Sequence, residues 1–238
     1  MRTPDSEEIT RWETDGYLLF HDAIHGEELS RLQASFDHWF DACKADWLTA
    51  IDTGASSATF YDIPQPLEKD HEFIDLVDHP AFYGYLKTFT DDQVLFLGPQ
   101  FRTVPPWPLT YTSWHPDVGP TNPLHIKVQI YINDVEPGGG EFAYVPGSHK
   151  SDAGPYDRVR DPAAMPGHLR FPAKAGTAIM FNSYGWHTAM DNHSGKPRKS
   201  IILIYEKRTP ERVRPEAFAS ISEQLKTPER RRLFSQES

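Results

Sequence analysis

The sequence predicts a mainly β domain of the jelly-roll or sandwich class, with helices before and after it. After Asp91, short runs of β-branched and aromatic residues alternate with glycine and proline turns. Before that point, apolar residues recur at helical spacing, and the last 30 residues return to a helical pattern. We therefore expect one domain, residues 1–238, with a helical buttress (1–90), a jelly-roll core (91–208) and a helical tail (209–238).

Helices are expected at several places in the first 90 residues. Ser6 can cap a short helix that ends near Asp15, where Gly16 suits a left-handed stop. A longer helix beginning at Gly26 places five apolar side chains on one face: Leu29, Leu32, Phe36, Trp39 and Phe40. Two more helical patterns cover residues 68–78 and 81–90. These helices are expected to pack on one sheet.

Five β-like runs follow, at residues 94–97, 124–133, 142–145, 177–181 and 200–205. In the second run, the even positions from Leu124 to Ile132 are apolar and the odd positions from His125 to Asn133 are polar. This alternation supports two interpretations equally. The polar face lies in water, or it lines a wet pocket inside a barrel.

The tail carries a second apolar stripe, formed by Phe218, Ile221 and Leu225, and then a cap and first-turn pair, Thr227 and Pro228. The stripe can pack within the chain or across a dimer, and we favour packing within the chain. Both a monomer and a homodimer are therefore compatible with the sequence.

The composition argues against several classes of protein. A net charge of -10 disfavours nucleic acid or an anionic membrane as the main partner. The longest purely apolar run, residues 201–205, is too short to span a bilayer, and the first residues show no apolar secretory segment. A single cysteine, Cys43, can form neither an internal disulfide nor a thiolate-rich metal site. We expect a cytoplasmic location.

Three residues far apart in the sequence form a candidate metal centre: His115, Asp117 and His187. The first two stand two apart, so in an extended segment they point to the same side and can share one metal. His187 comes just past a β-like run, where a ligand at a strand end would stand. Two histidines and one carboxylate are the ligand set of a non-haem Fe(II) centre with open positions, although they also suit zinc.

Arg198 and Ser200 favour His187 over His193 as the third ligand. They stand two apart on a predicted strand, so a guanidinium and a hydroxyl point the same way and suit a carboxylate. His193 lies in the turn that leads into this strand and is poorly placed to be a ligand from a separate strand end. Three hypotheses follow: an Fe(II) oxygenase with a dicarboxylate co-substrate, a zinc hydrolase, and a non-catalytic cupin-type binding protein. The complete set of residues favours the first.

Longer segments carry a family resemblance. The most specific is residues 131–150, where a strand, an acidic turn, glycines, a second strand and Pro146-Gly-Ser-His149 follow one another. Residues 12–19 and 26–32, the Trp114–Asp117 segment, the Trp186-His187 pair and Arg198 complete the pattern in order. Together, over most of the chain, these segments resemble the phytanoyl-CoA dioxygenase family of Fe(II)/2-oxoglutarate oxygenases.

The resemblance implies a double-stranded β-helix in which His115, Asp117 and His187 bind Fe(II) and Arg198 pairs with the distal carboxylate of 2-oxoglutarate, assisted by Ser200. Further candidates beside the co-substrate are Gln129, Lys127 and Tyr131. Candidates for the substrate pocket are Gln100, Arg102, Trp114, Asn182 and Trp186. The aromatic side chains of Trp107, Tyr111 and Tyr184 are further candidates for its walls.

The implied reaction uses O₂ to hydroxylate an unactivated C–H of a small molecule and converts 2-oxoglutarate to succinate and CO₂. Related halogenases carry a small residue in place of the carboxylate ligand, so Asp117 favours hydroxylation. The Gly138–Gly140 turn departs from the family's commoner Asn-Gly, and no basic cluster suits the phosphates of coenzyme A. The resemblance therefore leaves the substrate open.

Overall fold

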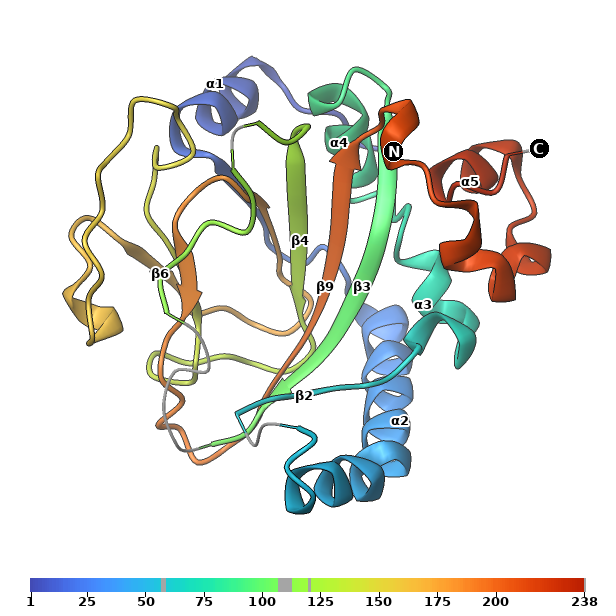
Figure 1. Ribbon diagram of the computed structural model, residues 1–238, viewed down its shortest axis with the longest axis horizontal. Helices are drawn as coiled ribbons and strands as arrows, with labels where there is room; N and C mark the ends of the chain where they lie inside the picture. Colours follow the sequence, from blue (N-terminus) through green and yellow to red (C-terminus); the bar gives the residue numbers. More distant parts are fainter. Residues whose placement is uncertain (57–58, 107–112, 120, 238) are drawn as a thin grey trace.

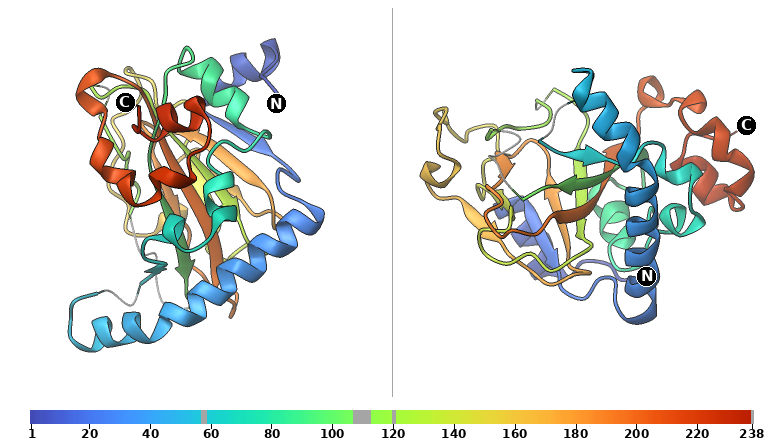
Figure 2. Two further views of the ribbon diagram at one scale, coloured as in Figure 1. Left: turned by 90° about the vertical axis from the view of Figure 1, so that its right-hand side faces the viewer. Right: turned by 90° about the horizontal axis from the view of Figure 1, so that it is seen from below.

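The computed structural model describes residues 1–56, 59–106, 113–119 and 121–237. Within these residues, two antiparallel sheets face each other (Figure 1). The major sheet has the strand order β1-β7-β4-β9-β3-β2, and the minor sheet has the order β6-β5-β8. Helices lie on the outer side of the major sheet (Figure 2). The predicted mainly β, jelly-roll class is confirmed.

The strands of the major sheet are β1 (Tyr17–Phe20), β2 (Tyr61–Asp62), β3 (Val94–Val104), β4 (His125–Tyr131), β7 (Ala178–Asn182) and β9 (Arg198–Lys207). Those of the minor sheet are β5 (Phe142–Tyr144), β6 (Leu169–Phe171) and β8 (His187–Ala189). Strand β3 runs far beyond the predicted residues 94–97. Its register against β9 shifts between Phe96 and Gly98, and this glycine has φ +144°, so a bulge carries the strand past an apparent turn.

The helices α1 (Ser6–Asp15), α2 (Gly26–Asp52), α3 (His71–Asp75) and α4 (Tyr83–Phe89), with the 3₁₀ turn η1 (Pro66–Glu68), form the first third of the chain. Asp5, and not Ser6, caps α1, because its carboxylate accepts from the backbone N–H of Glu8 while the Glu8 side chain reaches back to Asp5. Gly16 ends α1 at φ +82°, as predicted. No described helix combines the length and apolar character needed to cross a bilayer.

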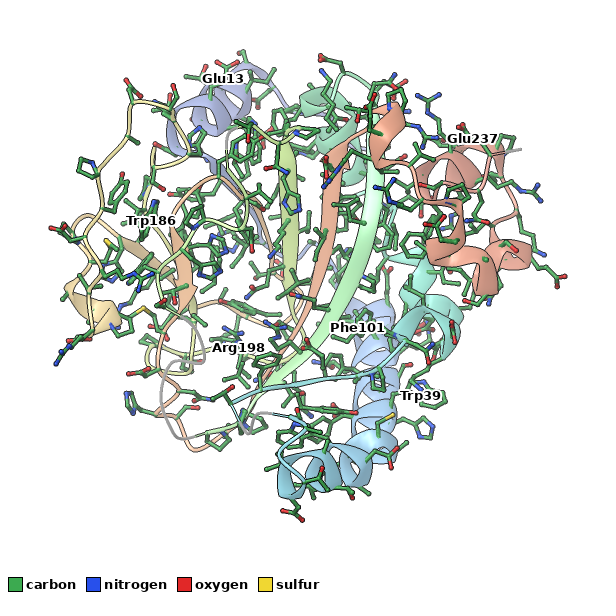
Figure 3. The ribbon with its side chains drawn as sticks, viewed as in Figure 1. Glu13, Trp39, Phe101, Trp186, Arg198 and Glu237 are labelled. Atoms are coloured by element: carbon green, nitrogen blue, oxygen red, sulfur yellow. The ribbon has the colours of Figure 1, made fainter. Side chains whose placement is uncertain are left out.

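One large apolar core joins the helices to the major sheet. Phe101 of β3 lies between the sheet and α2 (Figure 3), with ring centroids 6.0 Å from Phe36 and 4.4 Å from Phe73. The apolar side chains of β4 enter the same core. Burial of this area is the main contribution to the stability of the fold.

The tail consists of 3₁₀ segments and one short helix: η3 (Pro210–Arg212), η4 (Pro215–Gln224) and α5 (Pro228–Leu233). The predicted stripe of Phe218, Ile221 and Leu225 is buried in the core of its own chain, so packing within the chain is confirmed. The stripe lies largely on a 3₁₀ segment. Thr227 caps α5 by accepting from the backbone N–H of Arg230.

The polar face of β4 does not lie in bulk water. Ile126, Val128 and Ile130 point into the helix-covered core, while Lys127 and Gln129 line a cavity between the two sheets. Of the two interpretations that the alternation allowed, the pocket interpretation is therefore the correct one.

Candidate metal centre and adjoining cavity

Two backbone segments that are distant in sequence are tied together at the candidate metal centre. His115 and His187 form a β-bridge in which each backbone N–H donates to the other's carbonyl at 3.1 Å. The N–H of Asp117 donates to the carbonyl of Ser183 at 2.9 Å, in the turn before β8. These three bonds fix the His-x-Asp segment against the strand end that carries the second histidine.

The side chains of the three residues converge. Their potential ligand atoms lie within 4.8 Å of one another, the one such group among the described residues. His187 Nε2 is 3.3 Å from Asp117 Oδ2, and His115 Nε2 is 3.9 Å from Asp117 Oδ1. The spacing fits a single metal ion held by all three side chains.

Backbone carbonyls orient both imidazoles. His115 Nδ1 donates to the carbonyl of Ser113 at 2.6 Å, and His187 Nδ1 donates to the carbonyl of Gly185 at 2.9 Å. A carbonyl can only accept, so Nδ1 carries the proton and Nε2 keeps the lone pair that a metal needs. Burial, and then the proximity of the second titratable ring, His187, lower the pKa of His115, which keeps the ring neutral at pH 7.

Asp117 is held in its ionised form. Burial alone would raise its pKa, but the neighbouring His187 ring and the Lys127 ammonium hold the pKa far below its usual range. Lys127 Nζ lies 2.6 Å from Asp117 Oδ1. Asp117 Oδ2 is buried and accepts no hydrogen bond from the described residues. A buried carboxylate oxygen without a donor, facing two imidazole lone pairs, fits a metal cation.

A cavity of about 270 Å³ opens beside these side chains. Its polar wall combines the three candidate ligands with side chains from the major sheet: Gln100, Arg102, Lys127 and Gln129. Its apolar wall comes from Phe60, Phe142, Phe181, Ala189 and Ile202, and Thr188 completes the lining. The cavity is near the small end of the usual range for ligand sites.

The register of the major sheet orders these side chains in rows. Gln100, Ile202 and Gln129 are cross-strand partners and form one row that lines the cavity. Two residues further along each strand, on the same face, Ser200 pairs with Arg102 on β3 and with Tyr131 on β4.

Arg198 lies one row beyond Ser200, at the start of β9, between the two sheets (Figure 3). It is 1% exposed, and its Nη1 donates to the carbonyl of Gly140. Gly140 has φ +77°, and a Cβ there would lie 3.1 Å from Cβ of Asn192. The glycine turn that departs from the family pattern therefore supplies the carbonyl that contacts this arginine.

Two further buried polar atoms lack hydrogen-bond partners among the described residues. They are Gln129 Nε2 and Ser200 Oγ, on the rows between the metal centre and Arg198. Uncompensated buried polar groups cost roughly 1–3 kcal/mol each. A dicarboxylate reaching from the metal centre toward Arg198 would offer them acceptors.

Some predicted pocket residues lie elsewhere. Trp114 is buried and donates from Nε1 to the carbonyl of Pro162 at 2.9 Å. Trp186 packs on Tyr156 at 5.3 Å, on the far side of the minor sheet (Figure 3). Asn182 Oδ1 accepts from the backbone N–H of Tyr184 at 3.0 Å.

None of Trp114, Asn182 and Trp186 is among the described residues that line the cavity. These tryptophans fill an apolar cluster outside it, and the asparagine shapes a turn. Trp107 and Tyr111 lie outside the described residues. Tyr184 also stands apart from the cavity lining, and its hydroxyl donates to the carbonyl of Asn122 at 2.6 Å.

Tyr131, which was predicted to lie beside the co-substrate, makes hydrogen bonds that hold the two sheets together. Its hydroxyl donates to the carbonyl of Phe171 at 3.0 Å and accepts from the N–H of Phe142 at 2.8 Å. These bonds join the end of β4 to the minor sheet. Tyr131 does not appear among the described residues that line the cavity.

Sequence reasoning missed most of the apolar lining. Ile202 and Phe181 could have been found, because each continues the alternation of its strand on the cavity face. Phe60 has no comparable signal. It comes just before the two-residue strand β2, and its ring lies 3.9 Å from the guanidinium of Arg102. Arg102 also forms a two-bond ion pair with Asp62, at 2.8 and 2.6 Å.

Comparisons with known proteins agree with this geometry. Residues 12–200 match the profile of the family described as phytanoyl-CoA dioxygenase (PhyH). The ectoine dioxygenase of Nocardia farcinica (strain IFM 10152) is 21% identical in an alignment of 233 residues, and the match covers 84% of this chain and 77% of that protein.

Solved structures with similar folds include the non-haem α-ketoglutarate-dependent carbocyclase SnoK of nogalamycin biosynthesis. Its TM-score is 0.65 at 18% sequence identity, and the match covers 85% of this chain and 84% of that one. HygX of Streptomyces hygroscopicus, solved with nickel and 2-oxoglutarate, has a TM-score of 0.65, 12% identity and coverage of 86% and 88%. The fold, the converging His-Asp-His side chains and the profile match over most of the chain lead to one conclusion: this chain belongs to the phytanoyl-CoA dioxygenase family of Fe(II)/2-oxoglutarate oxygenases.

Proposed function

We propose that this protein hydroxylates an unactivated C–H of a small molecule, using Fe(II), 2-oxoglutarate and O₂ and releasing succinate and CO₂. The observation that carries the proposal is the convergence of two imidazole lone pairs and one buried carboxylate at the edge of a cavity. When bound, Fe(II) and 2-oxoglutarate supply the oxidising power that removes hydrogen from an unreactive carbon.

In this proposal, His115, Asp117 and His187 hold the metal. The two backbone-oriented imidazoles present neutral Nε2 atoms, and Asp117 offsets part of the metal's charge. A ligand set of two histidines and one carboxylate leaves positions open on the metal. The presence of the carboxylate favours hydroxylation over halogenation.

The co-substrate would lie along the cavity face of β4 and β9. Arg198 offers a guanidinium for the distal carboxylate. Ser200 Oγ and Gln129 Nε2, which have no hydrogen-bond partner in the described part of the chain, are polar groups on the path to it. In this arrangement the nearby carbonyl of Gly140 steadies the guanidinium. Tyr131 supports this wall through its bonds to the minor sheet rather than by direct contact.

Lys127 holds the metal-binding carboxylate in place before the ion enters. Its ammonium is 2.6 Å from Asp117 and its side chain lines the cavity. Once a metal cation shares Asp117, we propose that Lys127 faces the anionic co-substrate instead. Gln100 and Arg102 lie on the neighbouring strand of the same wall and would contact substrate.

Anaerobic titration with Fe(II) and 2-oxoglutarate tests the binding step, because the chelate gives a weak visible absorption band. We expect the band in the wild-type protein. Asp117→Ala should lose the band and lower 2-oxoglutarate-dependent succinate formation by on the order of 100-fold, because one of three metal contacts is gone. Asp152→Ala, which removes an exposed carboxylate outside the cavity, is the matched control.

Unchanged succinate formation in Asp117→Ala would contradict the ligand assignment. A folded wild-type protein that binds zinc in preference to Fe(II) and shows no chelate band would favour the zinc hydrolase hypothesis. Hydroxylation itself is tested by mass spectrometry of the turned-over substrate, where a gain of one oxygen is expected. Ring closure without a gain of oxygen would instead resemble the chemistry named for SnoK.

A further inference from the structure

A second hollow adjoins the cavity, between the C-terminal half of α2 and strand β2. This α2 groove has a volume of about 360 Å³, and its main lining residues are Cys43, Asp46, Trp47, Phe60, Tyr61 and Asp62. Phe60 lines both the groove and the cavity beside the metal centre. The two spaces are therefore neighbours that meet at the Phe60 side chain.

The shared wall is rigidly built. The guanidinium of Arg102 lies 3.9 Å from the centroid of the Phe60 ring. The same guanidinium donates two hydrogen bonds to the carboxylate of Asp62. Strand β2 pairs Asp62 with Arg102 in the register of the major sheet. The position of Phe60 is thus set by an ion pair and a cation–π contact, which makes it a suitable boundary between two parts of one site.

The groove has a consistent chemistry. Its base is aromatic, with the rings of Trp47 and Tyr61 5.2 Å apart at 44°. Its charged lining residues, within the described part of the chain, are both acidic. Asp62 forms an ion pair with Arg102, whereas Asp46 forms no ion pair with any described residue. Aromatic faces beside an uncompensated carboxylate are a receptor for a cation with apolar surface.

We propose that the α2 groove binds the part of the substrate that is not oxidised, and that it selects an aromatic or similarly flat apolar group bearing a positive charge. This inference rests on the proposed function, because it assumes that the oxidised carbon lies in the cavity. Its two supports are the contact of both spaces with Phe60 and the aromatic and acidic lining of the groove. Substrate class is then set by α2 and by β2, the edge strand of the major sheet.

Three probes with one ring and one chain length separate charge from shape: phenethylamine, 2-phenylethanol and 3-phenylpropionate. Their dissociation constants are measured by ligand-observed NMR on the full chain loaded with Zn(II). We expect phenethylamine to bind most tightly and the carboxylate most weakly. Asp46→Asn should lower the affinity for phenethylamine about twofold to fivefold, as for an exposed charge pair, and leave the affinity for 2-phenylethanol unchanged.

Asp41→Asn is the matched control, since it removes an exposed carboxylate from the same helix outside the groove. Trp47→Leu keeps an apolar side chain but removes the ring, and should lower the affinity for all three probes. Equal affinities for the three probes, or an unchanged phenethylamine affinity in Asp46→Asn, would overturn the proposed charge selection. If none of the three probes bound, the proposal that the groove is a binding site would be overturned.

Replacing Zn(II) by paramagnetic Mn(II) tests whether the groove and the metal centre belong to one site. The proton signals of bound phenethylamine should broaden with Mn(II) in the wild type and stay sharp in Asp117→Ala. Sharp signals in the wild type, with Mn(II) binding verified by electron paramagnetic resonance, would overturn the proposal that one substrate spans both spaces. The Fe(II)/2-oxoglutarate chelate band is independent of the probes, so failure of the groove and failure of the proposed function give different results.

Discussion

His125 shows how a single buried side chain near the metal centre links acidity to stability. It stands on the cavity side of β4, two residues before Lys127, and is 5% exposed. Burial, and then the charge of Lys127, lower its pKa to about 4. Its Nδ1 has no hydrogen-bond partner among the described residues, so the neutral ring is tolerated and the charged ring is not.

This shift predicts a pH dependence of folding. In the unfolded chain the ring takes up its proton near pH 6.5, but in the folded chain only near pH 4. Below pH 6.5 the unfolded state therefore binds more protons, and the free energy of unfolding falls as the pH is lowered toward 4. Between pH 7 and 4.5 the metal-free protein should lose about 2–3 kcal/mol through this residue.

His125→Gln should remove this part of the acid sensitivity. The measurement is urea unfolding in EDTA at a series of pH values, with the exposed His21→Gln as control. We expect a shallower decline for His125→Gln than for the wild type and the control. Parallel pH profiles for all three proteins would contradict the assignment.

At the scale of elements, the turn between β7 and β8 positions the second histidine ligand. The Gly185 carbonyl accepts from His187 Nδ1, and the Tyr144 hydroxyl donates to the Asn182 carbonyl at 3.0 Å across the same turn. A Cβ on Gly185 would lie 1.9 Å from this hydroxyl and 2.3 Å from the ring carbon that bears it. Tyr144 is fully buried and pairs with His187 across β5 and β8.

Gly185→Ala should therefore disturb both stability and metal binding. The tyrosine ring must move to admit a methyl group, at a cost of about 1–3 kcal/mol in the free energy of unfolding. Because the carbonyl that orients His187 belongs to the same residue, the affinity for Fe(II) or Mn(II) should fall as well. Thermal unfolding and anaerobic metal titration measure the two effects.

Gly119→Ala is the control for this turn. It adds the same methyl group near the same metal centre, but the new Cβ would meet no atom of the described residues within 4 Å. We expect stability and metal affinity close to wild type. If Gly185→Ala behaved like this control, the close approach of Tyr144 would not be what requires glycine.

For the whole molecule, the helical ends of the chain complete the apolar core on the outer side of the major sheet. Phe96 of β3 packs against Phe218 at 5.5 Å and Phe234 at 5.1 Å, and the last two rings meet at 5.2 Å. Strand β3 is also the strand that brings Gln100 and Arg102 to the cavity. The tail thus supports the sheet from the face opposite the site.

Phe234→Ala should lower the free energy of unfolding by about 3–5 kcal/mol, because the ring is fully buried among other rings. Metal affinity at low temperature should change little, since Phe234 is not among the described residues that line the cavity. Denaturant unfolding and metal titration check the two expectations. Leu48→Ala, at an exposed leucine of α2, is the control and should stay within about 0.5 kcal/mol of wild type.

The sequence supported the site to different extents at different residues. His115 and Asp117 could be paired because two residues of extended chain point the same way. Asp117 and His187 are 70 residues apart, so they could be joined only indirectly, from the place of His187 after a β-like run, from Arg198 and Ser200, and from the family pattern. Trp114 and Trp186 were misplaced, since a tryptophan beside a ligand in sequence can point into a neighbouring cluster. Local order does not fix that direction.

The mainly β class, the family and the set of residues able to hold a metal could be predicted from the sequence, because periodicity and chemical type are local properties. The tertiary structure decided that the polar face of β4 lines a cavity and that Tyr131 bonds to the minor sheet. It also decided that Phe60 separates that cavity from a groove on α2. These features depend on the register of strands distant in sequence and on the packing of a helix against a sheet edge, which no local pattern specifies.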